Sequence, residues 1–137
     1  MKKTLAIILS LLMVFSFSAT AADIVENEIT PMWSNMRNVF CDLTFSGNSA
    51  TAFINGESIS GTTTGFEVSV AVYEQVGSYW ILVDGVYEEP TRSFSTEVTI
   101  PTESGKKYKA VFEVVAHSET DSETFEDTII KTAPSLN

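Results

Sequence analysis

The side chains best suited to nucleophilic chemistry in this sequence are one thiol and one imidazole, Cys41 and His117. A catalytic thiol needs a base within hydrogen-bond reach. Both residues fall inside runs with the alternation of a β-strand, and neither has a flanking motif of a thiol enzyme. The alternation places Cys41 on an inward face, where a thiol behaves as a small hydrophobe, and His117 at an exposed strand end. We therefore expect no catalytic residue and no enzyme.

Acidic residues are the second possible source of chemistry. Carboxylates alternate in a polar turn and continue beyond it at Glu119, Asp121, Glu123, Glu126 and Asp127. Hard cations such as Ca²⁺ bind several carboxylate oxygens, but the glycine that bends an EF-hand loop is missing, which favours a solvated acidic turn. Zinc would need more His and Cys ligands than this chain has. We expect no metal and no cofactor, and the sequence leaves a calcium dependence of this turn open.

Aromatic residues cluster around one predicted hairpin, at Tyr73, Tyr79, Trp80 and Tyr87. Exposed rings stack on sugars or anchor protein partners. Neighbouring Tyr79 and Trp80 point to opposite faces of a strand, so at least one ring faces outward. The candidate ligand-binding residues are therefore Tyr79, Trp80 and Tyr87. The structural alternative is that Trp80 fills the core and that Tyr79 or Tyr73 forms a cross-strand pair.

The N-terminal segment has the composition of a secretory signal peptide. Lys2 and Lys3 precede an apolar run, and Ala19-Thr20-Ala21 is a small-x-small cleavage site. This predicts a signal peptide over 1–21 and an extracellular protein that begins at Ala22. A signal anchor is the alternative, but the apolar run is short for a span of about 20 residues. We expect no membrane partner after cleavage.

Acidic residues outnumber basic ones, 18 to 8, and the net charge is −10. Removing the predicted signal peptide removes two lysines and leaves a net charge of −12. A surface this acidic repels phosphate backbones and anionic lipids, which argues against nucleic acid and membrane partners. Charge of this kind also keeps a secreted domain soluble, and this interpretation is favoured over an acidic recognition surface.

Seven segments alternate apolar and polar residues with the period of a β-strand. They are Val39 to Phe45, Ala50 to Ile54, Phe66 to Glu74, Tyr79 to Val83, Ser93 to Ile100, Lys107 to His117 and Thr124 to Thr132. The last has a blurred period, which indicates a bulge or an edge strand. Residues 55–65 and 86–91 are predicted as loops, with Asp84-Gly85 ending the fourth strand. Residues 22–38 are expected to form a flexible lead-in, 39–132 the domain and 133–137 a C-terminal tail.

Pro101, Gly105 and Tyr108 stand where the chain enters the sixth segment. This is the arrangement of a corner at which a β-sandwich chain crosses between its sheets, with the Tyr hydroxyl bonded to backbone a few residues upstream. The sequence therefore predicts an all-β, seven-stranded antiparallel β-sandwich of the fibronectin type III or immunoglobulin-like kind. A small barrel or jelly roll is the alternative.

Three stretches carry a resemblance to a known group of proteins: W-S-N-M-R-N-V-F-C-D-L-T-F-S-G-N-S-A-T-A (33–52), V-Y-E-Q-V-G-S-Y-W-I-L-V (72–83) and G-K-K-Y-K-A (105–110). The chain resembles small, secreted, functionally uncharacterised proteins of Gram-positive bacteria with one fibronectin type III-like domain. The resemblance implies secretion and fold but no activity. Antibody domains have two core cysteines and a Trp on the third strand, whereas this chain has one Cys and Val70 or Val72 in that place, so antibody-type recognition is not implied.

The sequence therefore predicts a secreted, non-catalytic module for binding or adhesion, at the cell surface or in the medium, with an unknown protein or glycan as its partner. A carbohydrate-binding module is one alternative, which substitution of Trp80 or Tyr87 would distinguish. A small hydrolase or enzyme inhibitor is the other, and it would need a cleft of converging acids or a protruding rigid loop.

Overall fold

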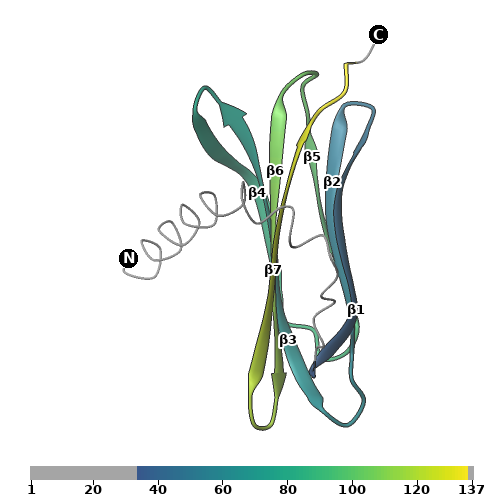
Figure 1. Ribbon diagram of the computed structural model, residues 1–137. Coiled ribbons are helices and arrows are strands. Elements are labelled where there is room, and N and C mark those ends of the chain that lie inside the picture. The colour runs from purple at the N-terminus through teal and green to yellow at the C-terminus, as the bar shows by residue number, and fades with distance from the viewer. Residues whose placement is uncertain (1–33, 136–137) are drawn as a thin grey trace, which may run out of the picture. The chain divides into compact units, whose positions relative to one another are not determined.

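The computed structural model describes residues 34–135, which form seven strands and no helix (Figure 1). The predicted signal peptide, residues 22–33 of the predicted lead-in and the last two residues of the tail lie outside the described residues. The strands are β1 (Met36–Ser46), β2 (Ser49–Ser58), β3 (Thr63–Val76), β4 (Tyr79–Glu88), β5 (Phe94–Pro101), β6 (Lys107–Ser118) and β7 (Ser122–Thr132).

The strands form two antiparallel sheets, one in the order β1-β2-β5 and the other in the order β4-β3-β6-β7. Both sheets contribute side chains to one buried core, among them Leu43 and Ile54 from the first sheet and Val70 and Phe112 from the second. The predicted all-β, seven-stranded antiparallel β-sandwich is therefore confirmed. Its more specific fibronectin type III or immunoglobulin-like type stays a prediction.

The alternation predicted for the fifth and sixth segments is confirmed. Every second residue of β5 is buried, beginning at Phe94 and ending at Ile100. In β6 the same period buries Tyr108, Ala110, Phe112, Val114 and Ala116. β7 pairs only with β6 in this sheet, so the blurred period of the last strand comes from its edge position, where one backbone side is open.

The predicted tyrosine corner is also confirmed. Tyr108 is fully buried, and its hydroxyl accepts a hydrogen bond of 2.8 Å from the Glu103 backbone N–H. Its ring meets the Phe45 ring edge-on, with centroids 6.2 Å apart. The first residue of the predicted tail, Ala133, is buried and exchanges backbone hydrogen bonds with Gly105 and Lys106. The corner and the C-terminal end of β7 therefore hold each other in place.

Three predicted boundaries are wrong, because the strands are longer than the sequence pattern suggests. β1 begins at Met36, inside the predicted lead-in. Most of the loop predicted over 55–65 belongs to β2 and β3, so that only 59–62 connect them. β4 passes through Asp84-Gly85 and continues to Glu88. Val72 lies opposite Asp84 and Tyr73 opposite Leu82, which makes Val83 the extra residue of a β-bulge that lets the strand continue.

Gly56 stays in a strand because an aromatic ring lies over it. Gly56 is paired with Phe94 in the register of β2 and β5, and a Cβ at this position would lie 2.5 Å from Phe94 Cζ. The Phe94 ring in turn packs on Phe66, with centroids 4.9 Å apart. Glycine therefore leaves the space that this ring pair occupies.

Replacing Gly56 with Ala is expected to lower the free energy of unfolding by about 1–3 kcal/mol, because the Phe94 ring must move out of its packed position. Urea unfolding measures the change. Gly65→Ala is the matched control, since Gly65 also lies in a strand and a Cβ there would come no closer than 3.8 Å to another atom. Equal losses in the two variants would show that the Phe94 ring is not the cause.

Candidate functional site

The β3–β4 hairpin extends from the sandwich (Figure 1). Apolar side chains are exposed on both of its faces. Val76 pairs with Tyr79, and Gly77 has a φ of 63°, as the first central residue of a type II′ turn requires. The exposed fractions are 43% for Val76, 74% for Tyr79, 49% for Ile81 and 57% for Leu82. We call the segment 75–83 the hairpin tip; it carries no charged residue.

Trp80 lies on the outer face of the four-stranded sheet and is not part of the buried core. Its ring lies over the ammonium group of Lys109, with Nζ 4.7 Å from the ring centroid, and Tyr73 contacts the same ammonium at 5.0 Å. Lys109 is only 5% exposed, and burial lowers its pKa. Cation–π attraction offsets part of the cost of removing this charge from water. The alternative in which Trp80 fills the core is therefore wrong.

Tyr87 lies on the other half of this outer face and takes part in a polar cluster. Its hydroxyl lies 2.9 Å from carboxylate oxygens of both Glu67 and Glu89. These hydrogen bonds raise the pKa of Tyr87, because ionisation would remove the shared proton beside two anions. The phenol is therefore a neutral donor at ordinary pH.

The three candidate residues do not form one platform. Tyr79 projects from the opposite face to Trp80 and lies opposite Val76, whereas Tyr73 lies opposite Leu82 on β4 and Lys109 on β6. Trp80 and Tyr87 share a face but are separated by the bulge and by roughly 20 Å of strand. The structure therefore brings Trp80 next to Lys109 and Tyr87 next to acids, and it leaves Tyr79 exposed at the hairpin tip.

A shallow depression of about 380 Å³ lies beside the Tyr87 cluster and is lined by Glu67, Glu89 and His117, together with loop residues before β5. His117 lies at the end of β6, as predicted, with its side chain 41% exposed. Its Nε2 is 2.7 Å from Glu67 Oε2, so it is also the partner of a carboxylate. The His117 and Tyr87 hydrogen bonds lower the pKa of Glu67. On the same face, partial burial and then the neighbouring Glu126 raise the pKa of Glu113.

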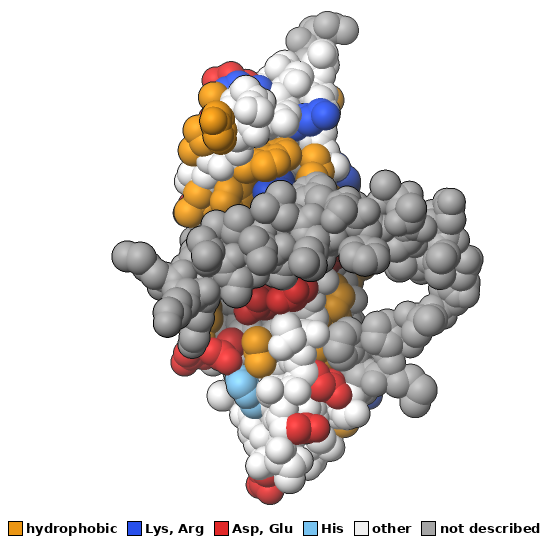
Figure 2. All heavy atoms as spheres, turned by 60° about the vertical axis from the view of Figure 1, so that its left-hand side comes forward, with side chains coloured by type: hydrophobic (Ala, Val, Ile, Leu, Met, Phe, Trp, Pro, Cys, Tyr) orange, Lys and Arg blue, Asp and Glu red, His pale blue; other side chains and the backbone are white. Residues whose placement is uncertain are grey.

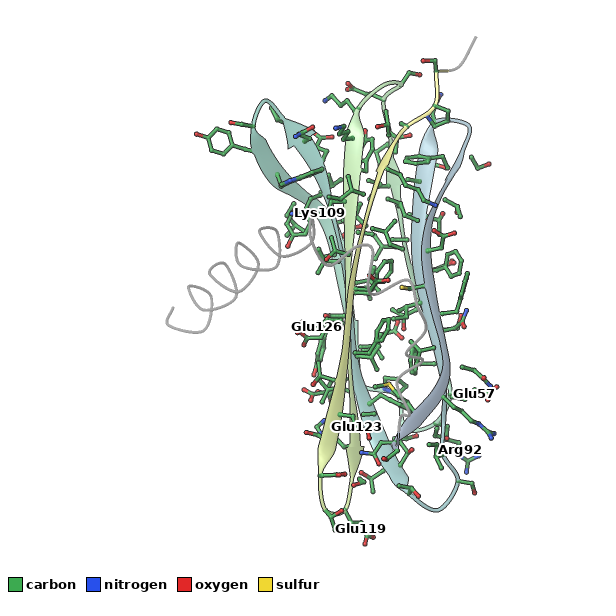
Figure 3. The ribbon with its side chains drawn as sticks, viewed as in Figure 1. Glu57, Arg92, Lys109, Glu119, Glu123 and Glu126 are labelled. Carbon is green, nitrogen blue, oxygen red and sulfur yellow. The ribbon has the colours of Figure 1, made fainter. Side chains whose placement is uncertain are left out.

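Negative charge thus gathers on the half of the face away from the hairpin tip. Figure 2 shows hydrophobic side chains in the upper part of this face and acidic side chains around the histidine lower down, and in Figure 3 Lys109 and Glu126 project from the same side of the sheet. Such a cluster attracts cations, but within residues 34–135 no group of three or more His, Cys, Asp or Glu side chains could hold a metal ion.

Cys41 and His117 are not brought together. The Cys41 thiol donates to Asp127 Oδ2 at 3.4 Å, and Asp127 pairs with Phe112, five residues before His117 on β6. Five residues of strand span roughly 16 Å. Cys41 is half-buried and packs against the core, as its inward position predicted.

The acidic turn considered for calcium uses two of its carboxylates to hold the start of β1. Glu123 accepts hydrogen bonds from the backbone N–H groups of Ser34 and Asn35, at 2.8 to 3.0 Å. Asp121 accepts one from the Asn35 side chain and another from Ser118. Glu119 lies at the tip of the turn, away from Glu123 (Figure 3). Asp121 and Glu123 therefore join the β6–β7 turn to the residues that begin the first strand.

No family model matches this chain, and no curated protein matches its sequence. The solved structures that are similar in part include the following three, at TM-scores of 0.33 to 0.37. Bacteroides uniformis β-glucuronidase 2 is 13% identical (TM-score 0.37) over 71% of this chain and 15% of the enzyme. The sporulation control protein Spo0M from Bacillus subtilis is 8% identical, with a TM-score of 0.35, over 76% of this chain and 51% of Spo0M. A protein from Archaeoglobus fulgidus is 8% identical, with a TM-score of 0.33, over 74% of this chain and 99% of that protein.

This chain therefore spans about a seventh of the glucuronidase and half of Spo0M. Likenesses at this level establish neither a family nor an activity. In the described part of the chain, no helix has the length and hydropathy needed to span a membrane.

Proposed function

We propose that this protein is a secreted, non-catalytic binding module whose contact surface is the hairpin tip. The observation that supports this is the exposure of Val76, Tyr79, Ile81, Leu82 and Val83 in one uncharged segment of an acidic chain. Together these side chains expose on the order of 450 Å² of mostly apolar surface, divided between the two faces of the hairpin tip. A contiguous exposed patch of about 300–600 Å² on a monomer is often functional.

A protein is the partner that this chemistry fits best. The hairpin tip offers branched aliphatic side chains and one exposed Tyr ring, which bury well against another protein surface. The amphipathic Tyr79 supplies a hydroxyl at the rim, and the lack of charge removes the desolvation cost that charged groups would bring to the centre of an interface.

A carbohydrate-binding module is the second candidate, supported by the exposure of two rings, Tyr79 at 74% and Tyr87 at 55%. A sugar would stack on a free ring face. The Trp80 face toward Lys109 is occupied, which makes Trp80 the least suitable of the three predicted residues for this role.

Catalysis by the acidic cluster has less support. A general acid that works near neutral pH needs a carboxyl with a raised pKa, close to the bond that it protonates. The pKa of Glu67 is lowered. The pKa of Glu113 is raised, but Glu113 does not line the depression, which is shallow and open to solvent.

The test compares Leu82→Ser with wild type for retention of cell-surface and extracellular proteins of the producing organism on immobilised protein. We expect Leu82→Ser to lose at least about tenfold in retention, because a buried Leu anchor contributes about 1.5–3 kcal/mol. Ile130→Ser is the matched control: Ile130 is a 41%-exposed aliphatic residue at the opposite edge of the same sheet, and its variant should retain partners like wild type.

A second retention measurement, with cell-wall polysaccharide, distinguishes a protein-binding module from a carbohydrate-binding module. Retention of cell-wall polysaccharide that Tyr79→Ala or Tyr87→Ala abolishes, in variants that unfold like wild type, would favour the carbohydrate-binding module. Protein retention that Leu82→Ser leaves unchanged would contradict the hairpin tip as the contact surface.

A further inference from the structure

We propose that the partner of the hairpin tip is a second copy of this chain, with β4 pairing antiparallel to β4 of that copy to join the two four-stranded sheets. This inference rests on the proposed function, since it takes the hairpin tip as the contact surface and names what binds there. It follows from four features: the open edge, the direction of its backbone groups, its charge and its apolar area.

The first half of β4 is an unguarded sheet edge. Among the described strands, none pairs with the side of β4 that faces away from β3. Natural edge strands usually carry charges, prolines or bulges that prevent further pairing. The other three edge strands have such features near their middle, namely Asp42 in β1, Glu97 in β5, and Glu126 and Asp127 in β7. β4 also has such features at its middle, the bulge at Val83 and the charge of Asp84. The four residues before them, Tyr79 to Leu82, have neither charge, proline nor bulge.

The hairpin geometry decides which backbone groups are available. In a two-residue hairpin the closing pair exchanges both hydrogen bonds, and the bonding then alternates along the strands. The N–H and C=O groups of Tyr79 and Ile81 therefore point toward β3, and those of Trp80 and Leu82 point away from it. An added strand must bond to Trp80 and Leu82.

One symmetric register uses all of these groups. If Ile81 lies opposite Ile81 of the second copy, Trp80 faces Leu82 of that copy as a hydrogen-bonded pair on each side of the two-fold axis. Tyr79 then faces Val83, so the opposed pairs from Tyr79 to Val83 are all uncharged, and Asp84 lies opposite the turn residue Ser78. Shifting the axis to Leu82 would place Trp80 opposite Asp84, and shifting it to Trp80 would place Leu82 opposite Ser78. The Ile81-centred register is therefore the self-complementary one.

Charge determines where a second copy can approach, and area determines how tightly it can bind. The formal net charge of −10 repels two copies over most of their surface, and the uncharged hairpin tip is where they approach at least electrostatic cost. Two copies would bury at most on the order of 900 Å² of side-chain surface plus the paired backbone, because pairing of the β4 edges leaves the faces of the joined sheet open; this lies at the low end for specific interfaces. We therefore expect a reversible dimer with a dissociation constant on the order of 10 μM.

The test is sedimentation velocity of protein that has been produced by secretion from a host cell. Its concentration is varied from about 1 μM to 1 mM, a range that spans the expected dissociation constant. Wild type should pass from monomer to dimer. Ile81→Lys and Ile81→Glu should each weaken the dimer at least about a hundredfold, because like charges then meet on the two-fold axis. An equimolar mixture of the two variants should dimerise again, because opposite charges meet there. Ile130→Lys, on the other edge of the sheet, should dimerise like wild type.

Restoration by mixing shows that both variants are folded and that Ile81 lies on the axis. A wild type that stays monomeric at 1 mM, a dimer that Ile81→Lys leaves intact, or variants that fail to associate when mixed would each overturn the proposal. A monomeric wild type whose protein retention is still lost in Leu82→Ser would overturn only the second copy as partner. Retention unaffected by Leu82→Ser would instead contradict the proposed contact surface.

Discussion

Replacing Tyr108 with Ala is expected to lower the free energy of unfolding by about 3–5 kcal/mol, the range found when a large buried ring is removed from a core. Tyr108 is fully buried, its ring packs edge-on against Phe45, and its hydroxyl holds the Glu103 N–H. The substitution removes the packing and the hydrogen bond together. Urea unfolding followed by tryptophan fluorescence measures the change.

Tyr108→Phe separates these two contributions. It keeps the ring and leaves the Glu103 N–H without its partner, so a loss of about 1–2 kcal/mol is expected. Tyr79→Ala is the control, because the ring of Tyr79 is mostly exposed and its removal should change the free energy of unfolding by about 0.5 kcal/mol or less. A Tyr108→Phe variant as stable as wild type would show that the hydroxyl contact does not stabilise the corner.

The corner and the core strands were predictable because their determinants are local. In β5 and β6 the side-chain period of two is continuous, and the buried face is the apolar one at nearly every position. Burial of one face fixes the register of a strand, so a reader of the sequence can assign the inward residues. The Tyr108 contact spans only five residues along the chain, which is why the sequence alone could indicate it.

Strand ends were less predictable because they depend on neighbours that are distant in sequence. Gly56 looks like a loop residue until Phe94 is known to lie over it. Asp84-Gly85 looks like a turn until the Val83 bulge and the pairing of Gly85 with Ala71 are known. In both cases the pairing of strands overrides the local preference of glycine for turns.

The candidate site was predicted only in part. The aromatic cluster pointed to the β3–β4 hairpin, and opposite directions for Tyr79 and Trp80 followed from the strand period. Burial of Lys109 could not be predicted, because its position alternates onto the outward face, and only the register of β4, β3 and β6 brings two rings over it. The contact between His117 and Glu67 likewise depends on the pairing of β3 with β6.

The surroundings of Cys41 could be predicted only in part from the sequence. The sequence placed it inward, and the structure adds Asp127 from β7, at the facing edge of the other sheet. Burial first, and then the charge and hydrogen bond of Asp127, raise the pKa of the Cys41 thiol to about 12 from an ordinary value near 9. A thiolate next to a carboxylate in a half-buried position is disfavoured, so the folded protein holds this thiol neutral.

Alkylation of Cys41 by iodoacetamide at pH 8 is therefore expected to be at least about a hundredfold slower in the folded protein than in urea, because only the thiolate reacts. In the folded state the rate should keep rising about tenfold per pH unit beyond pH 9, whereas in urea it should level off there. The same shift makes stability depend on pH. The Cys41 thiol keeps its proton to a higher pH in the folded state than in the unfolded state, so the free energy of unfolding should fall as the pH rises above about 9.

Asp127→Asn is the informative variant for this thiol, because it removes the carboxylate charge and keeps a side chain of the same size. It should accelerate alkylation of the folded protein several-fold without matching the unfolded rate, since burial is the larger cause of the shift. Glu126→Gln, the adjacent change on the outer face of β7, should leave the rate unchanged. A folded rate within tenfold of the unfolded rate would mean that Cys41 is neither shielded by the core nor held by Asp127, and the facing edges of the two sheets would then have to open readily at this point.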